Sequence, residues 1–454
     1  MIGLRCTPPV RFTLLLLGFI FSISLLLRVN YVQRTFVENP IRSDAFQYVA
    51  YGYNLFNHGT YSKEYPSKMP TPDAFRSPGY PLLLAVSFAL GGMGGFYSVS
   101  LHIQAVLGAL VPVLSFVLAR SFLSYGWVVA ASFLVALCPH LVSMTGYLLT
   151  ETLFSVVFLA AIVCFLYALR RRSILPVMMA AILWGGAYLV NETVLLIPYL
   201  LVMFCCRSGK GRDGQETGGR LFPRMMLFLL LFTLFPAGWG IRNHVSLPKG
   251  ALKGSSRALA TMSHGAYPDF IHRDPAYQYF PYREDPQYPE FSESLENFAK
   301  ILLERVKERP WRYLVWYCIE KPYYLWSWNI LQGQGDVYIY PVRTSLYMQS
   351  ATANATRMVM KILHPPILLL AFSGVVVFFL RYWRNRSLRG PVPVRALFGV
   401  CVYYTFLYTV FAPWPRYAVP LRPELYLCAL WTLREAIGYL GTKISAYRRS
   451  LVPT

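Results

Sequence analysis

The hydrophobic residues of this 454-residue chain gather in long runs, separated by short polar segments and by two longer ones. Several runs approach the roughly 20 residues that cross the hydrocarbon core of a bilayer as a helix. The pattern predicts an all-α polytopic membrane protein with about ten transmembrane helices. The predicted spans lie near residues 12–29, 98–119, 126–142, 151–169, 174–190, 193–206, 224–240, 365–381, 395–412 and 417–437.

Charge agrees with this class and indicates an orientation. Only 14% of the residues are charged, whereas a soluble domain carries about 25%. The net charge is +22, but no segment supplies the folded, solvated face of a nucleic-acid-binding surface, so nucleic acid is not an expected partner. The basic residues form short clusters that abut apolar runs, as cytoplasmic loops of membrane proteins do. These clusters lie at residues 170–173, 207–220, 381–395 and 443–449.

The same rule assigns sides to the two longest polar segments. With the N-terminus in the cytoplasm, alternation of the spans places every basic cluster on the cytoplasmic side. It places residues 30–97 outside as a first outer loop and residues 241–364 outside as a large outer loop. We therefore expect residues 1–454 to form one transmembrane domain whose chemistry lies in these two loops.

Both outer loops contain shorter amphipathic or aromatic stretches. Residues 44–57 have apolar groups at helical spacing on one face, and residues 80–91 are apolar but short for a span. Both stretches predict helices that lie in the membrane interface. Residues 311–328 of the large outer loop are rich in Trp and Tyr, which concentrate at the level of the lipid headgroups.

Asp44 stands at the head of the first amphipathic stretch, just outside the first span. Asp44 and Gln47 have the spacing of a capping box, and the local sequence alone favours this interpretation. The alternative is a general base at the membrane surface, which takes a proton from an acceptor hydroxyl or amine while a leaving group departs. The two interpretations are compatible, because a capped acid is also a positioned one.

Other polar residues lie in or beside apolar runs on the same predicted side as Asp44. Ionisable groups at membrane depth are costly and usually face a cavity or one another. The alternative is that they mark the ends of spans and reach the headgroups. Since all fall on one side, we expect a shared cavity, in which arginines beside a carboxylate suit a phosphate. The residues are Arg76, Glu151, Glu192, Arg242, Asn243, Arg416 and Tyr417.

The order of these motifs resembles that of the integral-membrane GT-C glycosyltransferases, in the branch of protein O-mannosyltransferases and lipid A aminoarabinose transferases. An acid after the first span, then "YVAYGYNLFNHGTY" and "RSPGYPLLLA", is similar to the first outer loop of that family. The stretches "LLTETLF", "PAGWGIRNH" and "PWPRYAVPLRPELYL" resemble later elements of it. The chain departs from many relatives at this acid, because Ser43-Asp44 supplies one acid where they have two adjacent ones.

The resemblance assigns roles to individual residues. It implies that Asp44 is the catalytic base and that the phosphate of the donor is bound by three arginines: Arg76, Arg242 and Arg416. The remaining candidates are expected to line the substrate cavity. They are Tyr48, Glu151, Glu192, Asn243 and Tyr417.

The resemblance further implies an enzyme that transfers a sugar from a polyprenyl-phosphate donor to a lipid, glycan or protein acceptor on the outer face of the membrane. We expect a multi-pass protein of a bacterial inner membrane with a periplasmic active site. A lipid or sugar transporter or flippase is the alternative, although we find in the sequence none of the inverted repeats typical of transporters. No cofactor is expected: the histidines have no metal-ligand spacing, and a divalent metal is left open without support.

Overall fold

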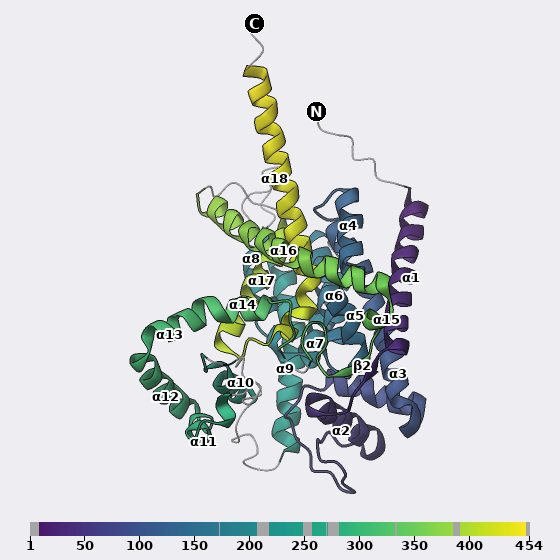
Figure 1. The fold of residues 1–454 in the computed structure, drawn as a ribbon, viewed down its shortest axis with the longest axis vertical. Helices are drawn as coiled ribbons and strands as arrows, with labels where there is room; N and C mark the ends of the chain where they lie inside the picture. The colour runs from purple at the N-terminus through teal and green to yellow at the C-terminus, as the bar shows by residue number, and fades with distance from the viewer. Residues whose placement is uncertain are drawn as a thin grey trace.

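The computed structural model describes residues 9–171, 173–206, 218–247, 257–268, 270, 281–331, 334–384 and 391–450. Helices account for almost all of the regular structure in these ranges (Figure 1). Two short strands, β1 (Phe36–Val37) and β2 (Val342–Thr344), pair antiparallel and tie the start of the first outer loop to the large outer loop. The prediction of an all-α protein is confirmed.

The helices fall into two groups by length. The long ones are α1 (Val10–Arg34), α3 (Gly79–Ala119), α6 (Glu151–Arg170), α9 (Gly218–Ser246), α16 (Ala351–Arg384), α17 (Val392–Val410) and α18 (Arg422–Ser450). The shorter ones are α2 (Ser43–His58), α4 (Tyr125–Ala136), α5 (Pro139–Ser143), α7 (Leu175–Val190), α8 (Ile197–Cys206), α10 (Arg257–Gly265), α11 (Tyr288–Phe291), α12 (Leu295–Glu308), α13 (Pro310–Val315), α14 (Lys321–Trp326) and α15 (Leu346–Gln349). Single turns join several of them: η1 (Met144–Gly146), η2 (Glu192–Val194), η5 (Pro281–Arg283), the π-helical turn η6 (Trp316–Glu320) and η7 (Pro415–Leu421).

Within the described residues, six helices are long and apolar enough to cross a membrane: α1, α3, α6, α9, α16 and α17. Helix α4 and the segment Pro139–Gly146 form a pair bent by 46°, which makes seven if the pair counts as one span. Two shorter apolar helices follow, at Leu175–Val190 and Glu192–Phe204. The chain is therefore a multi-pass membrane protein, and the number of ten spans stays a prediction.

The stretch 80–91 and the span 98–119 lie on the two sides of a kink in α3, so they are two helical segments that follow one another directly. The helix bends at Gly92, whose φ of 60° and ψ of −170° lie outside the helical region. Glycine reaches such dihedrals without steric cost, so the break in the apolar pattern around residue 92 becomes a kink.

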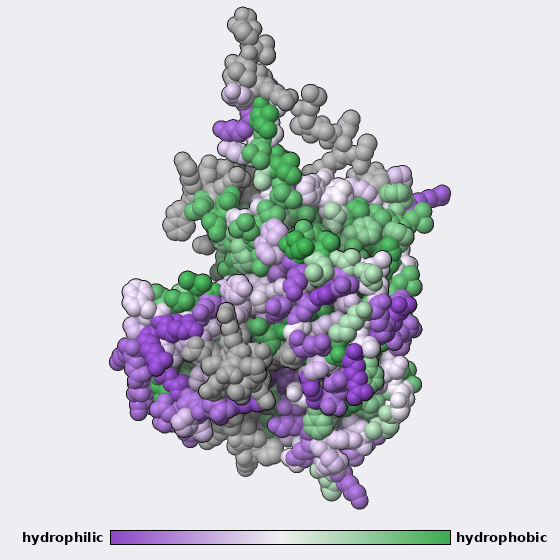
Figure 2. Space-filling view, in the orientation of Figure 1, coloured by the Kyte–Doolittle hydropathy of each residue, from purple (hydrophilic) through white to green (hydrophobic). Residues whose placement is uncertain are grey.

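The packing separates the inside of the bundle from its lipid-facing side. Helix α6 packs on both α7 and α3, and 61% of its most apolar window is buried, whereas the corresponding windows of α1 and α9 are only 17% buried. Hydrophobic residues dominate the upper half of the surface in Figure 2 and polar residues the lower half. Helices α2 and α10 to α12 lie in the lower half, at the opposite end from the start of α1 and the end of α18 (Figure 1).

Candidate active site

Helix α2 brings the first candidate, Asp44, to the edge of the bundle. Its buried face, which includes Tyr48 and Gly52, packs on α3. A Cβ atom at Gly52 would stand 2.7 Å from the Cβ of Leu84, so the close approach of the two helices depends on this glycine. Helix α2 ends at Gly59, which has a φ of 63°, the left-handed conformation typical of a glycine at a helix C-terminus.

Asp44 is held between two arginines that come from distant parts of the chain. Arg76 Nη2 donates to Asp44 Oδ1 at 2.5 Å, and Arg416 Nη2 donates to Oδ2. Arg76 Nε also donates to Gln47 Oε1 at 2.7 Å. Both arginines are 6% exposed, so the ion triad of Asp44, Arg76 and Arg416 is largely shielded from water.

The interpretation of Asp44 and Gln47 as a capping box is wrong. The N-cap position of α2 is Arg42, and Asp44 lies inside the first turn of the helix. Both side chains point to arginines instead of the backbone amides that a cap would satisfy. A charge-assisted contact to a buried guanidinium is stronger than a neutral contact to an amide, which gives the physical reason for this choice.

The ion triad fixes the protonation state of Asp44. Burial favours the neutral carboxyl, but Arg416 and Arg76 outweigh it and hold the pKa of Asp44 well below its usual value of 3.8. The carboxylate is therefore charged at any working pH. It is also a weak base as long as both of its oxygen atoms accept hydrogen bonds from guanidinium groups.

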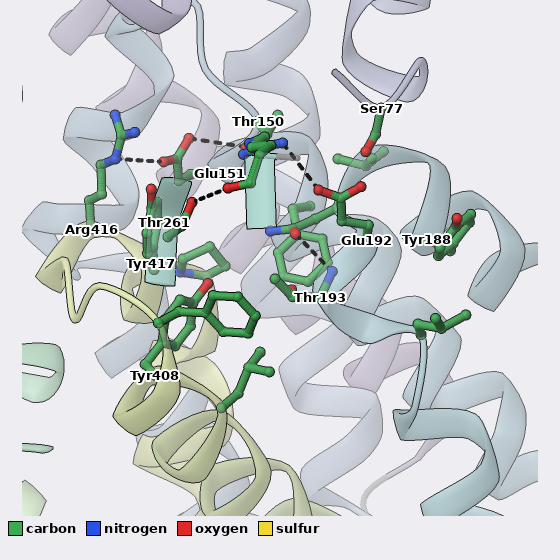
Figure 3. A pocket seen from close by; sticks show the side chains of 18 of the residues that line it. Ser77, Thr150, Glu151, Tyr188, Glu192, Thr193, Thr261, Tyr408, Arg416 and Tyr417 are labelled. Carbon is green, nitrogen blue, oxygen red and sulfur yellow. Dashed lines mark hydrogen bonds and ion pairs between the residues drawn. The ribbon is translucent and has the colours of Figure 1, made fainter. Parts of the chain in front are cut away.

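A cavity of about 490 Å³ opens beside the triad (Figure 3). Six of the nine predicted site residues line it, and Arg76 joins them through its bond to Asp44. The shared cavity that the sequence predicts is thus present for seven of the candidates. The six lining residues are Asp44, Tyr48, Glu151, Glu192, Arg416 and Tyr417.

Arg416 links the triad to a second acid in the cavity. Its Nε atom stands 3.8 Å from Glu151 Oε1 and has no hydrogen-bond partner among the described residues. Thr150 Oγ1 stands 3.5 Å from the other carboxylate oxygen of Glu151. In Figure 3, Arg416 and Glu151 face each other on one side of the cavity, and Glu192 lies across from them. The guanidinium of Arg416 therefore has donor capacity that a ligand in the cavity can use.

Sequence reasoning missed the contribution of α10. Arg257 and Thr261 of this helix line the cavity, and Arg257 Nη1 stands 3.5 Å from Glu192 Oε1. An amphipathic segment with a basic residue in the large outer loop was the available signal. The tyrosines 188, 403 and 408 and several apolar side chains were also not predicted to line the cavity. The apolar ones include Leu195, Leu196, Leu407 and Phe411.

Two predicted site residues lie elsewhere. Within the described part of the chain, neither Arg242 nor Asn243 lines the cavity. Arg242 Nη1 donates to the Asp73 backbone oxygen at 2.7 Å, and its guanidinium lies 5.2 Å from the centre of the Tyr61 ring. It lines a separate hollow of about 370 Å³ with Trp239. The C-terminal end of α9 thus contacts residues 61–73 of the first outer loop, and the convergence of Arg242 with the other two arginines is not observed.

The described ranges contain no group of three or more His, Cys, Asp or Glu side chains arranged as metal ligands.

No family model matches the chain, and no curated protein matches it. Solved structures similar to it include the oligosaccharyltransferase AglB of Archaeoglobus fulgidus with an inhibitory peptide and a dolichol-phosphate, at 14% identity and a TM-score of 0.46. That match covers 98% of this chain and 52% of AglB, so the chain spans about half the length of that protein.

ArnT of Cupriavidus metallidurans is similar at 13% identity and a TM-score of 0.38 in its apo state, covering 93% of this chain and 77% of ArnT. The same enzyme bound to undecaprenyl phosphate gives 14% identity and a TM-score of 0.32, covering 94% of this chain and 78% of ArnT. AglB and ArnT are both GT-C membrane glycosyltransferases, the superfamily that the sequence motifs resemble.

Proposed function

We propose that the chain is a membrane glycosyltransferase that moves a sugar from a polyprenyl-phosphate donor to a lipid, glycan or protein acceptor. The observation that carries the proposal is the ion triad at the cavity: a carboxylate held by Arg76 and Arg416, both largely buried. Guanidinium groups bind phosphate oxygens with the same paired geometry that they use for carboxylates. The two arginines can therefore exchange Asp44 for the phosphate of the donor.

That exchange would activate the base. Arg416 and Arg76 are what hold the pKa of Asp44 low, so a phosphate that takes up their charge allows the pKa of Asp44 to rise. Asp44 would then accept the proton of the acceptor hydroxyl or amine as the acceptor atom bonds to the anomeric carbon. The bond between that carbon and the phosphate oxygen breaks, and polyprenyl phosphate leaves with the electron pair, stabilised by the arginines.

The lining of the cavity suits both parts of such a donor. Leu195, Leu196 and Leu407 form an apolar wall of the cavity. Isoprenoid units fit such a wall because they have no polar group that needs a hydrogen-bond partner. Hydroxyl and carboxylate groups on the other side, among them Glu151 and Tyr417, offer hydrogen bonds to the hydroxyls of a sugar. A donor with a lipid tail also explains why the carboxylate lies on an interfacial helix next to the first span.

The location follows from the same reasoning. The cavity is lined by the two outer loops and by the span ends that alternation of the basic clusters assigns to the same side. We therefore place the reaction on the outer face of the membrane, periplasmic if the membrane is a bacterial inner membrane.

The direct test uses the purified full-length chain in liposomes. Vesicles receive polyprenyl-phosphate sugars and a mixture of lipid and peptide acceptors, and the release of free polyprenyl phosphate is measured. We expect release that depends on acceptor and falls by roughly 10²–10⁴-fold in Asp44→Asn, the range for loss of acid–base catalysis. Glu38→Gln is the matched control, because Glu38 also pairs with an arginine, Arg343, but both side chains are exposed.

Movement of the intact donor across the bilayer without release of polyprenyl phosphate would instead indicate a transporter. Full release by the Asp44→Asn variant would refute the role of Asp44 while leaving the transferase intact.

A further inference from the structure

Residues 310–326 form a helical arm whose exposed face carries no charged side chain. Helix α13, the π-helical turn η6 and helix α14 follow one another without a break. Trp311 is 76% exposed, Ile319 63% and Tyr323 68%. After Pro310, every exposed side chain of this arm is apolar or a thiol: Trp311, Leu314, Val315, Cys318, Ile319 and Tyr323.

None of the three charged residues of the arm is among its exposed ones: Lys321 is buried, and the side chains of Arg312 and Glu320 are 35% and 30% exposed. Arg312 Nη1 donates to Glu320 Oε2 at 2.7 Å. Lys321 is fully buried, and its Nζ donates to the Thr409 backbone oxygen at 2.6 Å, at the C-terminal end of α17. A helix that faces water has its charges outside and its apolar stripe inside. This arm buries Trp316, Leu325 and Trp326 and is apolar on its exposed face as well, the pattern of a helix whose outer face is not in water.

Helix α12, directly before the arm, has the ordinary arrangement. It buries Phe298 and Ile301. Five of its exposed residues are charged: Glu296, Lys300, Glu304, Lys307 and Glu308. The composition of the exposed face therefore changes at Pro310, from mostly charged on α12 to uncharged on the arm.

The apolar face of the arm adjoins the lipid-facing surface of the bundle. Helix α14 packs on α17, where Trp326 Nε1 donates to Thr405 Oγ1 at 2.9 Å. The same helix α17 exposes Phe406, 72% accessible, together with Val402 and Val410. Figure 2 shows hydrophobic residues along the upper edge of the arm, next to the hydrophobic zone of the long helices. The two surfaces are continuous, and α17 is one of the helices that can span the membrane.

We propose that residues 310–326 are a membrane-seated arm: the apolar face lies among the acyl chains of the outer leaflet, while α12 remains in water. Burial of large apolar side chains in lipid supplies the favourable free energy, as in other helices that lie in the interface. The charges of the arm, which would be costly in that layer, have partners: Arg312 pairs with Glu320, and the buried Lys321 donates to a backbone oxygen of α17.

The arm also holds one wall of the cavity. Trp316 Nε1 donates to the Gly265 backbone oxygen at 3.0 Å, and Arg312 Nη2 donates to the Pro268 backbone oxygen at 2.6 Å. Gly265 ends α10, the helix that brings Arg257 to the cavity. The bilayer would thus fix the position of α10 through the arm, whichever reaction the cavity serves.

Cys318 on the apolar face is a built-in probe for the test. The full chain is placed in lipid nanodiscs, in which both faces are open to solvent, and treated with a charged, water-soluble maleimide. The labelled site is assigned by peptide mass spectrometry, with Cys318→Ser as the blank. The matched control is Lys300→Cys in the Cys318→Ser background, which places a thiol on the water-facing side of α12. We expect Lys300→Cys to react at least tenfold faster than Cys318, and the two to react equally after unfolding in detergent.

A second measurement separates lipid from a covering protein. Dibrominated phosphatidylcholine in the nanodisc should quench the fluorescence of the chain, and part of this quenching should disappear in Trp311→Phe. Equal labelling rates of the two thiols in the nanodisc would overturn the proposal. Slow labelling of Cys318 with no quenching assigned to Trp311 would also overturn it, because a second copy or another protein would then cover the face.

Discussion

Substitution of Asp44 by Asn should strengthen binding of the phosphate while it weakens transfer. In the free protein, Arg76 Nη2 and Arg416 Nη2 each donate to one carboxylate oxygen of Asp44. A phosphate must compete with that carboxylate for the same guanidinium groups. Asn has no charge and one acceptor oxygen, so at least one arginine becomes free to bind the ligand.

The magnitude follows from the contacts that change. A hydrogen bond to a charged group contributes about 1.5–3 kcal/mol, and about 1.4 kcal/mol is a factor of ten in affinity. One released contact therefore predicts roughly a 10- to 150-fold lower Kd for polyprenyl phosphate in Asp44→Asn. The free energy of unfolding of Asp44→Asn should be lower than that of the native chain. The substitution leaves two buried guanidinium groups without their anion, which costs about 3–5 kcal/mol when a buried pair is broken. Because the Asp44 side chain is 25% exposed and Glu151 lies 3.8 Å from Arg416, we expect the lower end of that range.

The assay is thermal unfolding of the purified protein with increasing polyprenyl phosphate, run in parallel with sugar transfer. Without ligand, Asp44→Asn should have a lower Tm than the native chain. The increase in Tm on addition of polyprenyl phosphate should be larger for Asp44→Asn than for the native chain. Its transfer rate should fall by roughly 10²–10⁴-fold. Weaker binding of polyprenyl phosphate in this variant would refute the exchange mechanism, since it would mean that Asp44 helps to hold the ligand rather than competing with it.

Four further outcomes are expected. Arg416→Ala should raise the Kd for polyprenyl phosphate by about 10- to 150-fold, since it removes a charge-assisted contact; an unchanged Kd would exclude it as a phosphate ligand. The pKa of Asp44 is lowered on folding, so the triad stabilises the protein above about pH 4 and loses this effect as the pH falls further. The difference in Tm between the native chain and Asp44→Asn should therefore stay constant from pH 7 to about pH 5 and shrink below about pH 4. Arg242→Ala should loosen the first outer loop to proteolysis with little change in the donor KM, because Arg242 does not line the cavity; a KM increase as large as that of Arg416→Ala would contradict this placement. Cysteines introduced at His264 and Lys443 should be labelled from opposite sides of the membrane; labelling of both from one side would contradict the topology.

The sequence by itself determined the class of the molecule and the position of helix α2. An apolar run of about 20 residues is unfavourable in water and long enough to cross the bilayer as a helix. The run alone therefore predicts a membrane helix, without knowledge of the rest of the fold. The helical period of residues 44–57 is likewise a local property, and α2 spans Ser43–His58 as this period predicts. The sequence did not determine the number of spans, because short apolar helices such as α7 and α8 have the same apolar pattern but fall just below the length that crosses a bilayer.

The family-like motifs also identified most of the cavity, since chemistry at the membrane surface requires rare charged residues in an apolar context. They could not say how those charges pair. Asp44 looked like a cap because the partners nearest to it in the sequence are backbone amides, whereas its actual partners, Arg76 and Arg416, stand 32 and 372 positions away.

Only the tertiary structure decided which charges meet. It turned Arg242 onto the first outer loop, where backbone oxygens satisfy it, and brought Arg257 from the large outer loop to the cavity. It also gave partners to the charges of residues 310–326: Lys321 donates to a backbone oxygen of α17, and Arg312 donates to Glu320 and to the Pro268 backbone oxygen. The physical reason is the same in each case. Local sequence sets the helices and their apolar faces through short-range periodicity, but a buried charge is stabilised only by the group that the fold places within a few ångströms of it.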